Sequence, residues 1–353
     1  MIISRTPYRI SFFGGGTDYP GWYRKHGGSV LATAINKYCY ITCRYLPPFF
    51  EHKSRIVYSK IESFTQLDEI QHPAVRETLR FLNMHRGVEI HHDGDLPARS
   101  GMGSSSAFTV GLLNAMHALR GSMATKQQLM MDSIHIEQEM IKETVGSQDQ
   151  ATTAFGGFNH IMFQQNGEIA VRPVVLSLER MRELSSHLML FYTGIKRTAA
   201  DVAESYVADI ASKRRQLRIM KDLVDESLAL LNCNGELIGF GELLHEAWQA
   251  KRSLSHCVTN REVDDMYQAA RNAGALGGKI TGAGGGGFLL LFVPPQHQTR
   301  VREALSKLIH VPFSFDYTGS QIIYFQHEED FASIDLDRKG SINAFRELSE
   351  MRL

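Results

Sequence analysis

Hydrophobic and polar residues alternate along the first part of the chain with the period of β-strands. Residues 2–13 alternate in this way, and β-branched and aromatic residues dominate 30–46 and 55–59. The pattern predicts strands there, because successive side chains of a strand point to opposite faces of a sheet. The same reasoning predicts further strands at 88–92, 159–163, 169–174 and 187–192.

Apolar residues follow the 3.6-residue helical period mainly in the second half. That period predicts helices at 73–84, 126–145, 199–231, 236–256, 262–273 and 298–308, with strands ending at Val293 and lying near 313–315 and 321–325. The change to long amphipathic helices after residue 180 predicts two domains, at residues 1–180 and 181–353. Strands and helices occur in both, which predicts an α+β fold.

A loop rich in glycine and serine precedes an apolar helical segment that runs to Leu119. Residues 95–108 read Asp-Leu-Pro-Ala-Arg-Ser-Gly-Met-Gly-Ser-Ser-Ser-Ala-Phe. Gly101 and Gly103 let a ligand approach the backbone, the first helical amides have no internal partner, and the serine hydroxyls add donors. This pattern is typical of an anion site. A plain loop-to-helix turn is the alternative, since serine and glycine cap many helices.

Two more glycine clusters stand at the ends of predicted strands. One is Gly14-Gly15-Gly16, followed by Thr17 and Asp18. The other is residues 277–287, with seven glycines in eleven positions between a predicted helix and a buried strand. A hairpin turn is the alternative for the first cluster, but three glycines exceed what a turn needs. A linker is the alternative for the second, but a flexible linker would not stand between a helix and a buried strand. We expect each to bring backbone close to a ligand.

Two acidic residues stand out by their positions. Glu137 shares one helical stripe with Met130, Ile134 and Ile141, so it is predicted to face the core. A buried carboxylate needs a partner, and either a buried ion pair or a hard cation would supply one. Asp149 lies in a polar cluster after the predicted helix. The pattern there fits a capped helix start and a catalytic carboxylate equally.

Composition narrows the choice of partners. The 353 residues are 43% hydrophobic, enough for two cores, and 38 basic residues balance 38 acidic ones without a basic block. Nucleic acid is therefore not expected as a ligand. No apolar run is long enough for a membrane span or a signal peptide, so we expect a cytoplasmic protein. Cys39 and Cys43 share one strand face and are expected to be reduced core residues. The oligomeric state stays open.

Three stretches together resemble the GHMP kinases, the family of galactokinase, homoserine kinase, mevalonate kinase and phosphomevalonate kinase. They are residues 6–19, 97–107 and 279–288, and their order and spacing span most of the chain. The resemblance implies an N-terminal α+β domain, a C-terminal ferredoxin-like domain, and ATP and substrate in the cleft between them. It also implies phosphoryl transfer from ATP with Mg²⁺, a reaction that depends on positioning and charge stabilisation.

The resemblance also implies a role for individual residues. Asp149 would take the proton from the attacking hydroxyl, and Arg9 beside it would keep the aspartate ionised and offset developing charge. Ser105 and Glu137 would hold Mg²⁺. The expected ATP contacts are Pro97, Arg99, Gly101, Met102, Gly103, Ser104 and Ser105. Arg99 departs from the glycine common at its position, and we expect it either to disturb the loop or to contact a phosphate.

The expected substrate contacts are Gly15, Gly16, Thr17, Asp18, Gly284 and Gly285. Galactokinases have Gly-Glu-His-Thr-Asp where this chain has Gly-Gly-Gly-Thr-Asp at 14–18. The loss of the glutamate removes bulk and negative charge, which favours a sugar with an additional carbon and a terminal phosphate. Lys196 and Arg197 are candidates for that phosphate, with solvated surface charge as the alternative.

Two other functions stay open at this point. A kinase of the same family acting on another sugar, such as fucose, would keep every catalytic residue. A non-catalytic sensor could bind ATP and sugar without turnover. The retained set of Arg9, Ser105, Glu137 and Asp149 favours an enzyme, because a sensor needs neither a base nor a metal ligand.

Overall fold

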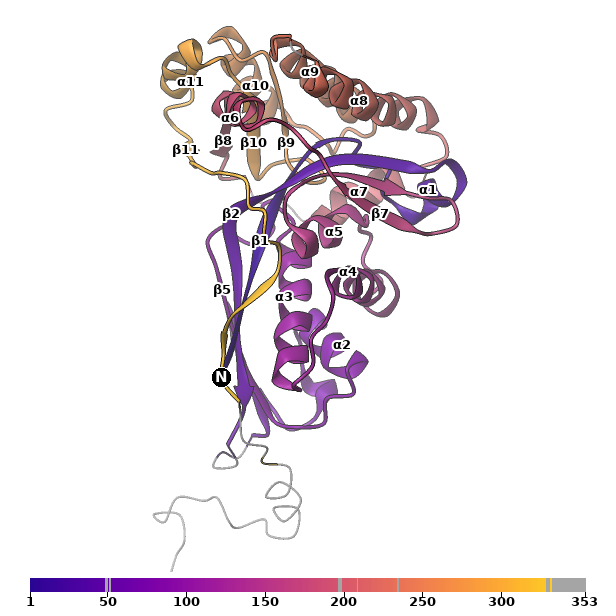
Figure 1. The fold of residues 1–353 in the computed structure, drawn as a ribbon, viewed down its shortest axis with the longest axis vertical. Helices are drawn as coiled ribbons and strands as arrows, with labels where there is room; N and C mark the ends of the chain where they lie inside the picture. Colours follow the sequence, from indigo (N-terminus) through magenta and orange to yellow (C-terminus); the bar gives the residue numbers. More distant parts are fainter. Residues whose placement is uncertain are drawn as a thin grey trace, which may run out of the picture.

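In a computed structural model, the chain forms two parts stacked along its long axis (Figure 1). The structure describes residues 1–47, 50, 52–195, 199–207, 209–233, 235–327 and 331. The long strands β1 (Ile2–Phe13) and β2 (Gly28–Tyr45) pair antiparallel and reach from one end of the molecule to the junction of the two parts. Segments at the ends of these strands can therefore contribute to a site at that junction.

The first part is built on an eight-stranded sheet. Its order is β12-β1-β2-β5-β3-β4, with β6 pairing both β2 and β7. Only the β3 and β5 pair is parallel among the described strands. The remaining strands are β3 (Ser54–Val57), β4 (Ile61–Phe64), β5 (Val88–Gly94), β6 (Phe158–Phe163), β7 (Ile169–Pro173) and β12 (Gln321–Phe325).

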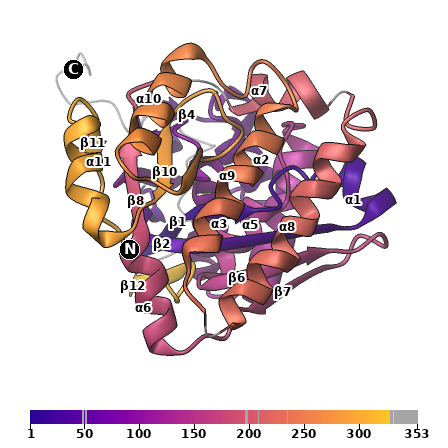
Figure 2. The ribbon, with the colours of Figure 1, turned by 90° about the horizontal axis from the view of Figure 1, so that it is seen from above.

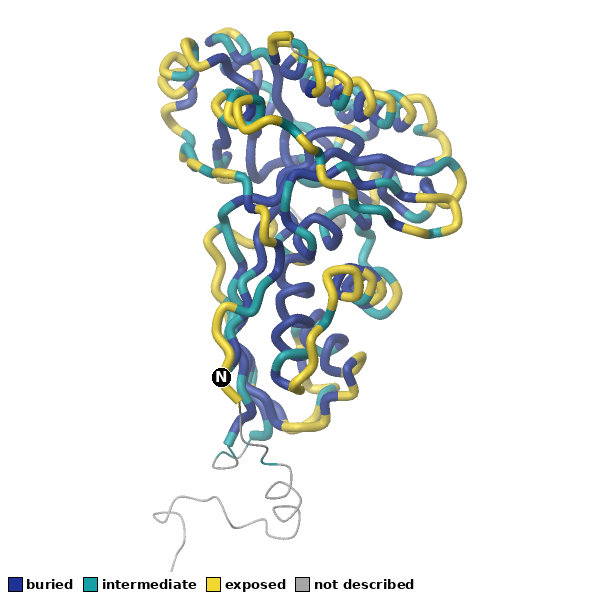
Figure 3. Tube along the Cα trace, in the orientation of Figure 1, coloured by how far each residue is buried: buried dark blue, intermediate teal, exposed yellow. Residues whose placement is uncertain are grey.

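Helix α3 (Ser104–Leu119) packs against β1 and β2 and is buried along almost its whole length (Figure 3). Its residues are apolar on nearly all sides, as expected for a helix enclosed by other elements. The other helical segments of this part are α1 (Pro20–His26), α2 (Pro73–Phe81), α4 (Lys126–His135), a π-helix (Ile136–Met140), α5 (Gln148–Phe155) and a 3₁₀ turn (Leu67–Glu69). The core thus fixes α3 and, with it, the position of its N-terminus.

The second part is a four-stranded antiparallel sheet in the order β11-β8-β10-β9. Its strands are β8 (Leu188–Tyr192), β9 (Gly277–Ile280), β10 (Phe288–Phe292) and β11 (Ile309–His310). Helices connect β8 to β9 and β10 to β11, which is the ferredoxin-like arrangement that was expected. The α+β fold class is confirmed.

Helices cover this second sheet, and α8 and α9 run alongside each other (Figure 2). The helical segments are α6 (Leu178–His187), α7 (Ala199–Val207), α8 (Arg214–Asn232), α9 (Ile238–Arg252), α10 (Arg261–Asn272), a 3₁₀ turn (Pro295–His297) and α11 (Gln298–Ala304). None of the helices within the described ranges is long and apolar enough to cross a membrane.

Three expectations from the sequence are corrected. The helix predicted at 199–231 is broken into α7 and α8. The helix predicted at 126–145 becomes a π-helix at Ile136 and ends at Met140. The strand at 321–325 pairs with β1, so it lies in the first sheet and not in the second half of the chain. A boundary at residue 180 stays a prediction, but β12 shows that the chain returns to the first sheet after it. Cys39 and Cys43 are buried free thiols, as expected.

Phe12 connects the two parts of the core. It is fully buried on β1, and its ring makes edge contacts with Phe158 of β6, Phe240 of α9 and Phe315. Aromatic pairs in this geometry add to the free energy gained by burying their area. Phe12 therefore helps to hold α9 against the first sheet, together with Phe13, whose ring also makes an edge contact with Phe240.

We expect Phe12→Ala to lower the free energy of unfolding by about 3 to 5 kcal/mol, because it leaves a cavity between the two parts. Phe325→Ala is the matched control, since Phe325 is 48% exposed on β12. Its expected cost is below about 1 kcal/mol. Guanidinium unfolding followed by circular dichroism measures both. Equal losses in the two variants would contradict the role given to Phe12.

Candidate active site

A cleft of about 270 Å³ lies where the two parts meet. The carboxyl-terminal half of β1, the glycine loop before α3, the N-terminus of α5 and the second sheet's helix α9 all contribute to it. Its lining includes Arg9, Ser11, Gly15, Gly16, Asp18, Arg99, Gly101, Gly103, Ser104, Ser105, Ser106, Glu143, Gln148, Asp149, Lys251, Lys279, Gly282 and Ala283. The structure therefore brings all three glycine clusters to one place.

The loop before α3 takes a left-handed backbone at alternate positions. The φ angles of Arg99, Gly101 and Gly103 are 59°, 77° and 73°. A non-glycine residue in this region costs roughly 1 kcal/mol, which explains why glycine would suit position 99. A Cβ atom on Gly101 would come within 2.6 Å of the Thr281 carbonyl oxygen. Glycine is therefore required where this loop meets the second sheet.

The N-terminus of α3 opens into the cleft. Gly103 is its N-cap, and Ser104, Ser105 and Ser106 form its first turn. Free amides and hydroxyls at a helix start form a favourable site for an anion such as phosphate. Of the residues assigned to ATP, Arg99, Gly101, Gly103, Ser104 and Ser105 line the cleft. Pro97 is exposed outside it, and Met102 is buried in the core.

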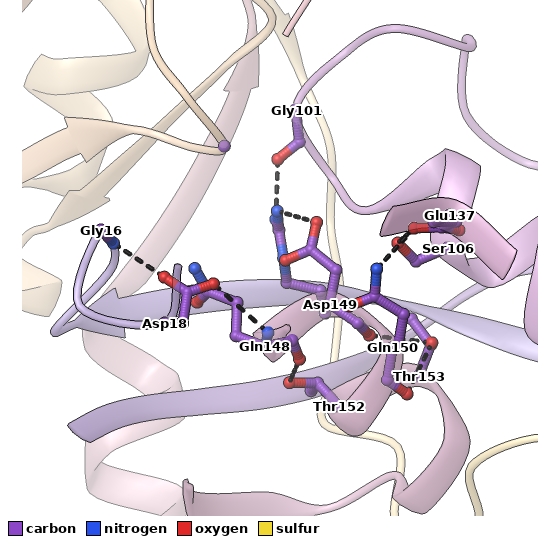
Figure 4. A network of polar contacts seen from close by, with 12 residues as sticks. Gly16, Asp18, Gly101, Ser106, Glu137, Gln148, Asp149, Gln150, Thr152 and Thr153 are labelled. Carbon is purple, nitrogen blue, oxygen red and sulfur yellow. Dashed lines mark hydrogen bonds and ion pairs between the residues drawn. The ribbon is translucent and has the colours of Figure 1, made fainter. Parts of the chain in front are cut away.

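Asp149, which is labelled in Figure 4, forms a two-pronged ion pair with Arg9 in the cleft. Arg9 Nε and one terminal nitrogen donate to the two carboxylate oxygens of Asp149, each at 2.7 Å. The other terminal nitrogen donates to the Gly101 carbonyl at 2.7 Å. The Asp149 side chain is 24% exposed and that of Arg9 only 4%. The pair thus presents a carboxylate to the cleft beside the anion site.

Asp18 is buried next to the start of α5. Its carboxylate accepts from the Gly16 amide at 2.8 Å and the Gln148 amide at 3.3 Å. Burial raises its pKa, and these amide hydrogen bonds oppose the rise. A Cβ on Gly146 would overlap an Asp18 carboxylate oxygen, so the glycine there is needed for this approach. Thr17, by contrast, donates to the Gly14 and Ser29 carbonyls and holds the turn.

Glu137 is completely buried at the start of the π-helix, as its place on the apolar stripe predicted. Ser106 Oγ and Gln150 Nε2 donate to its Oε2 (Figure 4), while Oε1 has no hydrogen-bond partner in the described structure. Burial raises the pKa of Glu137 to about 7, and the nearby charge of Glu143 adds to the effect. The free oxygen and the serine hydroxyls are hard donors, which fits Mg²⁺.

The third glycine cluster packs mainly against protein. A Cβ on Gly282 would meet the Gly101 backbone at 2.6 Å, and one on Gly287 would meet the Ser100 carbonyl at 2.2 Å. Gly284 lies against Val258, whose carbonyl accepts from the Gly285 amide. Gly282 and Ala283, not Gly284 and Gly285, line the cleft. Substrate contact by Gly284 and Gly285 stays a prediction. Gly282 and Gly287 serve the close packing of the two parts.

The remaining candidates fall in two groups. Gly15 and Gly16 line the cleft as expected. Lys196 and Arg197 lie outside the described residues.

Sequence reasoning missed several polar residues of the cleft. Lys251 of α9 and Lys279 of β9 are buried there, and Ser106 rather than Ser105 is the hydroxyl bonded to Glu137. Lys251 could have been found, because it continues the buried stripe of Leu244 and Trp248 at helical spacing, as Glu137 does on its own helix. Ser106 carries no such pattern, since three consecutive serines look alike in the sequence.

Two models of known protein families match the chain, one in each of its two parts. Residues 70–157 match the family model described as the GHMP kinases N terminal domain, and residues 220–310 match the one described as GHMP kinases C terminal. The chain is 31% identical over 244 residues to a mevalonate kinase of Methanothermobacter thermautotrophicus, covering 64% of this chain and 74% of that protein.

Two heptose phosphate kinases are also similar. A D-glycero-alpha-D-manno-heptose 7-phosphate kinase of Campylobacter jejuni is 29% identical over 318 residues, covering 87% of this chain and 93% of that protein. A crystal structure described as a D-glycero-D-manno-heptose 1-phosphate kinase of Bacteroides thetaiotaomicron superposes with a TM-score of 0.75 at 23% identity. It covers 92% of this chain and 100% of that one. The second likeness establishes the fold.

The unusual environment of Glu137 gives a test in metal-free protein. Between its ordinary pKa of 4.5 and the folded value of about 7, the folded state keeps a proton that the unfolded state has lost. This group's contribution to stability is therefore greatest below pH 4.5 and falls as the pH rises to 7. Glu137→Gln removes the charge. We expect the free energy of unfolding of Glu137→Gln, minus that of the wild type, to increase by about 2 to 3 kcal/mol from pH 5 to pH 8.5.

Urea unfolding in EDTA at the two pH values measures this difference. Glu139→Gln is the matched control, because Glu139 is exposed two residues along the same turn. Parallel pH profiles for wild type and Glu137→Gln would show that the carboxyl group is not held in its neutral form.

Proposed function

The chain belongs to the GHMP kinases, and we propose that it transfers the γ-phosphoryl group of ATP to the anomeric hydroxyl of D-glycero-D-manno-heptose 7-phosphate. The product would be the 1,7-bisphosphate, used in the synthesis of nucleotide-activated heptose. Membership of the family makes the protein a phosphotransferase. The observation that carries the proposal is the Arg9 and Asp149 pair, which faces the same cleft as the N-terminus of α3.

The proposed reaction uses the residues of this cleft in fixed roles. The triphosphate of ATP lies on the amides and hydroxyls at the start of α3. Asp149 takes the proton of the attacking anomeric hydroxyl, because a carboxylate that already binds Arg9 still has acceptor positions free. Arg9 holds that carboxylate in place and lies beside the transferred group, where its positive charge stabilises the transition state.

Glu137, with the hydroxyls of Ser105 and Ser106, would hold the Mg²⁺ that accompanies ATP. The ion would neutralise part of the charge on the phosphates. Among the described residues there is no cluster of three or more acidic, histidine or cysteine side chains that could hold a metal. A site with one carboxylate and hydroxyl groups suits an ion that keeps waters and phosphate oxygens as its other ligands.

The acceptor is proposed from the relatives and from the cleft together. The kinase from Campylobacter jejuni that aligns with 87% of this chain is named for heptose 7-phosphate. Gly15 and Gly16 leave the cleft wall beside β1 without side chains, which favours a longer acceptor than a hexose. A family member acting on another sugar such as fucose is the second candidate, and a sensor without turnover is the third.

We expect Asp149→Asn to lower kcat by at least about 10³-fold, because the amide cannot accept the proton of the acceptor. Arg9 keeps a partner oxygen in this variant, so affinity for a nucleotide analogue should change little. A coupled assay of ADP release gives kcat, and fluorescence titration gives nucleotide affinity. Asp265→Asn is the control, because Asp265 is exposed on α10. Wild-type activity in Asp149→Asn would remove this residue from the mechanism.

A substrate panel tests the acceptor itself. We expect ADP release to be fastest with D-glycero-D-manno-heptose 7-phosphate among free and phosphorylated hexoses and heptoses. Phosphorus NMR of the product should show a new anomeric phosphate beside the original ester. Faster turnover of fucose would support the second candidate, and no ADP with any sugar would support the sensor.

A further inference from the structure

Two buried lysines in the cleft form no ion pair with the residues that the structure describes. Lys251 Nζ donates to the Gly282 carbonyl, and Lys279 Nζ donates to the Phe12 carbonyl at 3.0 Å. Both side chains are about 95% buried or more. Neither forms an ion pair with any residue in the part of the chain that the structure describes. Each ammonium group has three N–H bonds, so two donors on each remain for a ligand.

Arg9, Asp18, Arg99, Glu143 and Asp149 also line the cleft, and the charges of Asp18 and Asp149 act on Lys251. Arg9 is paired with Asp149, and Asp18 is bound by backbone amides. Burial lowers the pKa of Lys251 to about 7, and burial also lowers the pKa of Lys279 well below its ordinary range. Keeping an unpaired ammonium out of water is costly unless a ligand supplies the opposite charge. An anion bound here would favour the charged form of both lysines.

Ser11 adds an independent observation. It is 5% exposed, it lines the cleft, and its Oγ has no hydrogen-bond partner in the described structure. It directly precedes Phe12, whose carbonyl holds Lys279. A Cβ on Gly15 would lie 3.5 Å from Ser11 Oγ, so the glycine leaves the space beside this hydroxyl open. A free hydroxyl and two ammonium groups lining one cleft are the donors that a phosphate group accepts.

We propose that Ser11, Lys251 and Lys279 form a subsite for the phosphate monoester that the acceptor itself carries. This subsite rests on the proposed function and deepens it, because it names the residues that bind the acceptor's own phosphate. It would select a phosphorylated sugar over the free sugar. Lys251 and Lys279 are specificity-determining residues in this scheme, and they do not take part in the proton transfer.

The acceptor's phosphate fits these donors better than the transferred group of ATP does. Arg9 already binds the Gly101 carbonyl and Asp149, so it is the cation next to the reacting atoms. Ser11 lies instead near the end of β1 that leads into Gly15 and Gly16, and Lys279 of β9 donates to the neighbouring Phe12 carbonyl. The triphosphate has its own donors at the start of α3. A phosphate at the far end of the acceptor would therefore reach the lysines while its anomeric hydroxyl reaches Asp149.

Lys251→Met and Lys279→Met test the subsite. Each removes the ammonium but keeps the volume of the side chain, so the variants should fold, with melting temperatures at or above that of the wild type. We expect KM for heptose 7-phosphate to rise about 10- to 100-fold in each, because a hydrogen bond to a charged group is lost. KM for ATP and turnover of unphosphorylated heptose should change less than about twofold by the same reasoning.

Three further proteins make the result specific. Ser11→Ala should raise the same KM by about 5-fold, as expected for one hydroxyl donor. Lys279→Arg should recover part of the affinity, because it restores the charge. Lys307→Met is the control, since Lys307 is exposed on the surface. Calorimetric titration with heptose 7-phosphate and with inorganic phosphate, in the presence of Mg-ADP, measures binding without turnover.

The outcomes separate this inference from the function on which it rests. If wild type does not phosphorylate heptose 7-phosphate, the proposed acceptor is wrong. Loss of inorganic phosphate binding in the lysine variants then still supports an anion subsite, and no phosphate binding to wild type overturns it. If wild type is active but the variants raise KM for ATP, or lower kcat equally with both sugars, the lysines serve the transferred group. An unchanged KM for both substrates also overturns the subsite.

Discussion

The ion pair between Arg9 and Asp149 is the interaction on which the arrangement of the cleft depends. Arg9 lies on β1, Asp149 lies 140 residues later on α5, and the same guanidinium binds the Gly101 carbonyl before α3. The Arg9 amide also donates to the Met102 carbonyl. Removing either charge would leave the other in a largely enclosed place, which is expensive. One side chain thus fixes the distance between an acidic group and an anion-binding helix start.

Close packing of glycines imposes the second constraint. Gly101 meets the backbone at Thr281 and Gly282, while Gly287 meets Ser100, all at distances that exclude a side chain. The two glycine loops therefore pack directly against each other in the protein without a ligand. Their contact lies at the junction between the two parts, beside the cleft that Gly101 and Gly282 also line. Glycine-rich motifs here reflect backbone packing as much as ligand approach.

Local pattern predicted much of this structure, and nonlocal contacts account for what it missed. The spacing of hydrophobic residues predicted the long strands, helix α3 and the inward position of Glu137. The glycine and serine pattern predicted the anion site at the start of α3. The sequence of β12 does not predict that it pairs with β1, because the residues of an edge strand do not specify which sheet it joins. The π-helix at Ile136 was hidden for a related reason. Glu137 within it accepts hydrogen bonds from Ser106 of α3 and Gln150 of α5, and the helix's own sequence does not contain these contacts.

Burial shifts the pKa of several groups in and beside the cleft, in opposite directions. Burial raises the pKa of Glu137 to about 7, raises that of Asp18, and lowers the pKa of Lys251 to about 7. A cation at Glu137 favours its ionised form and releases a proton, whereas an anion at Lys251 favours the ammonium and takes one up. Proton release on cation binding and proton uptake on anion binding therefore offset each other. A site that receives both ligands can therefore bind them near neutral pH with less net proton exchange than either ligand causes alone.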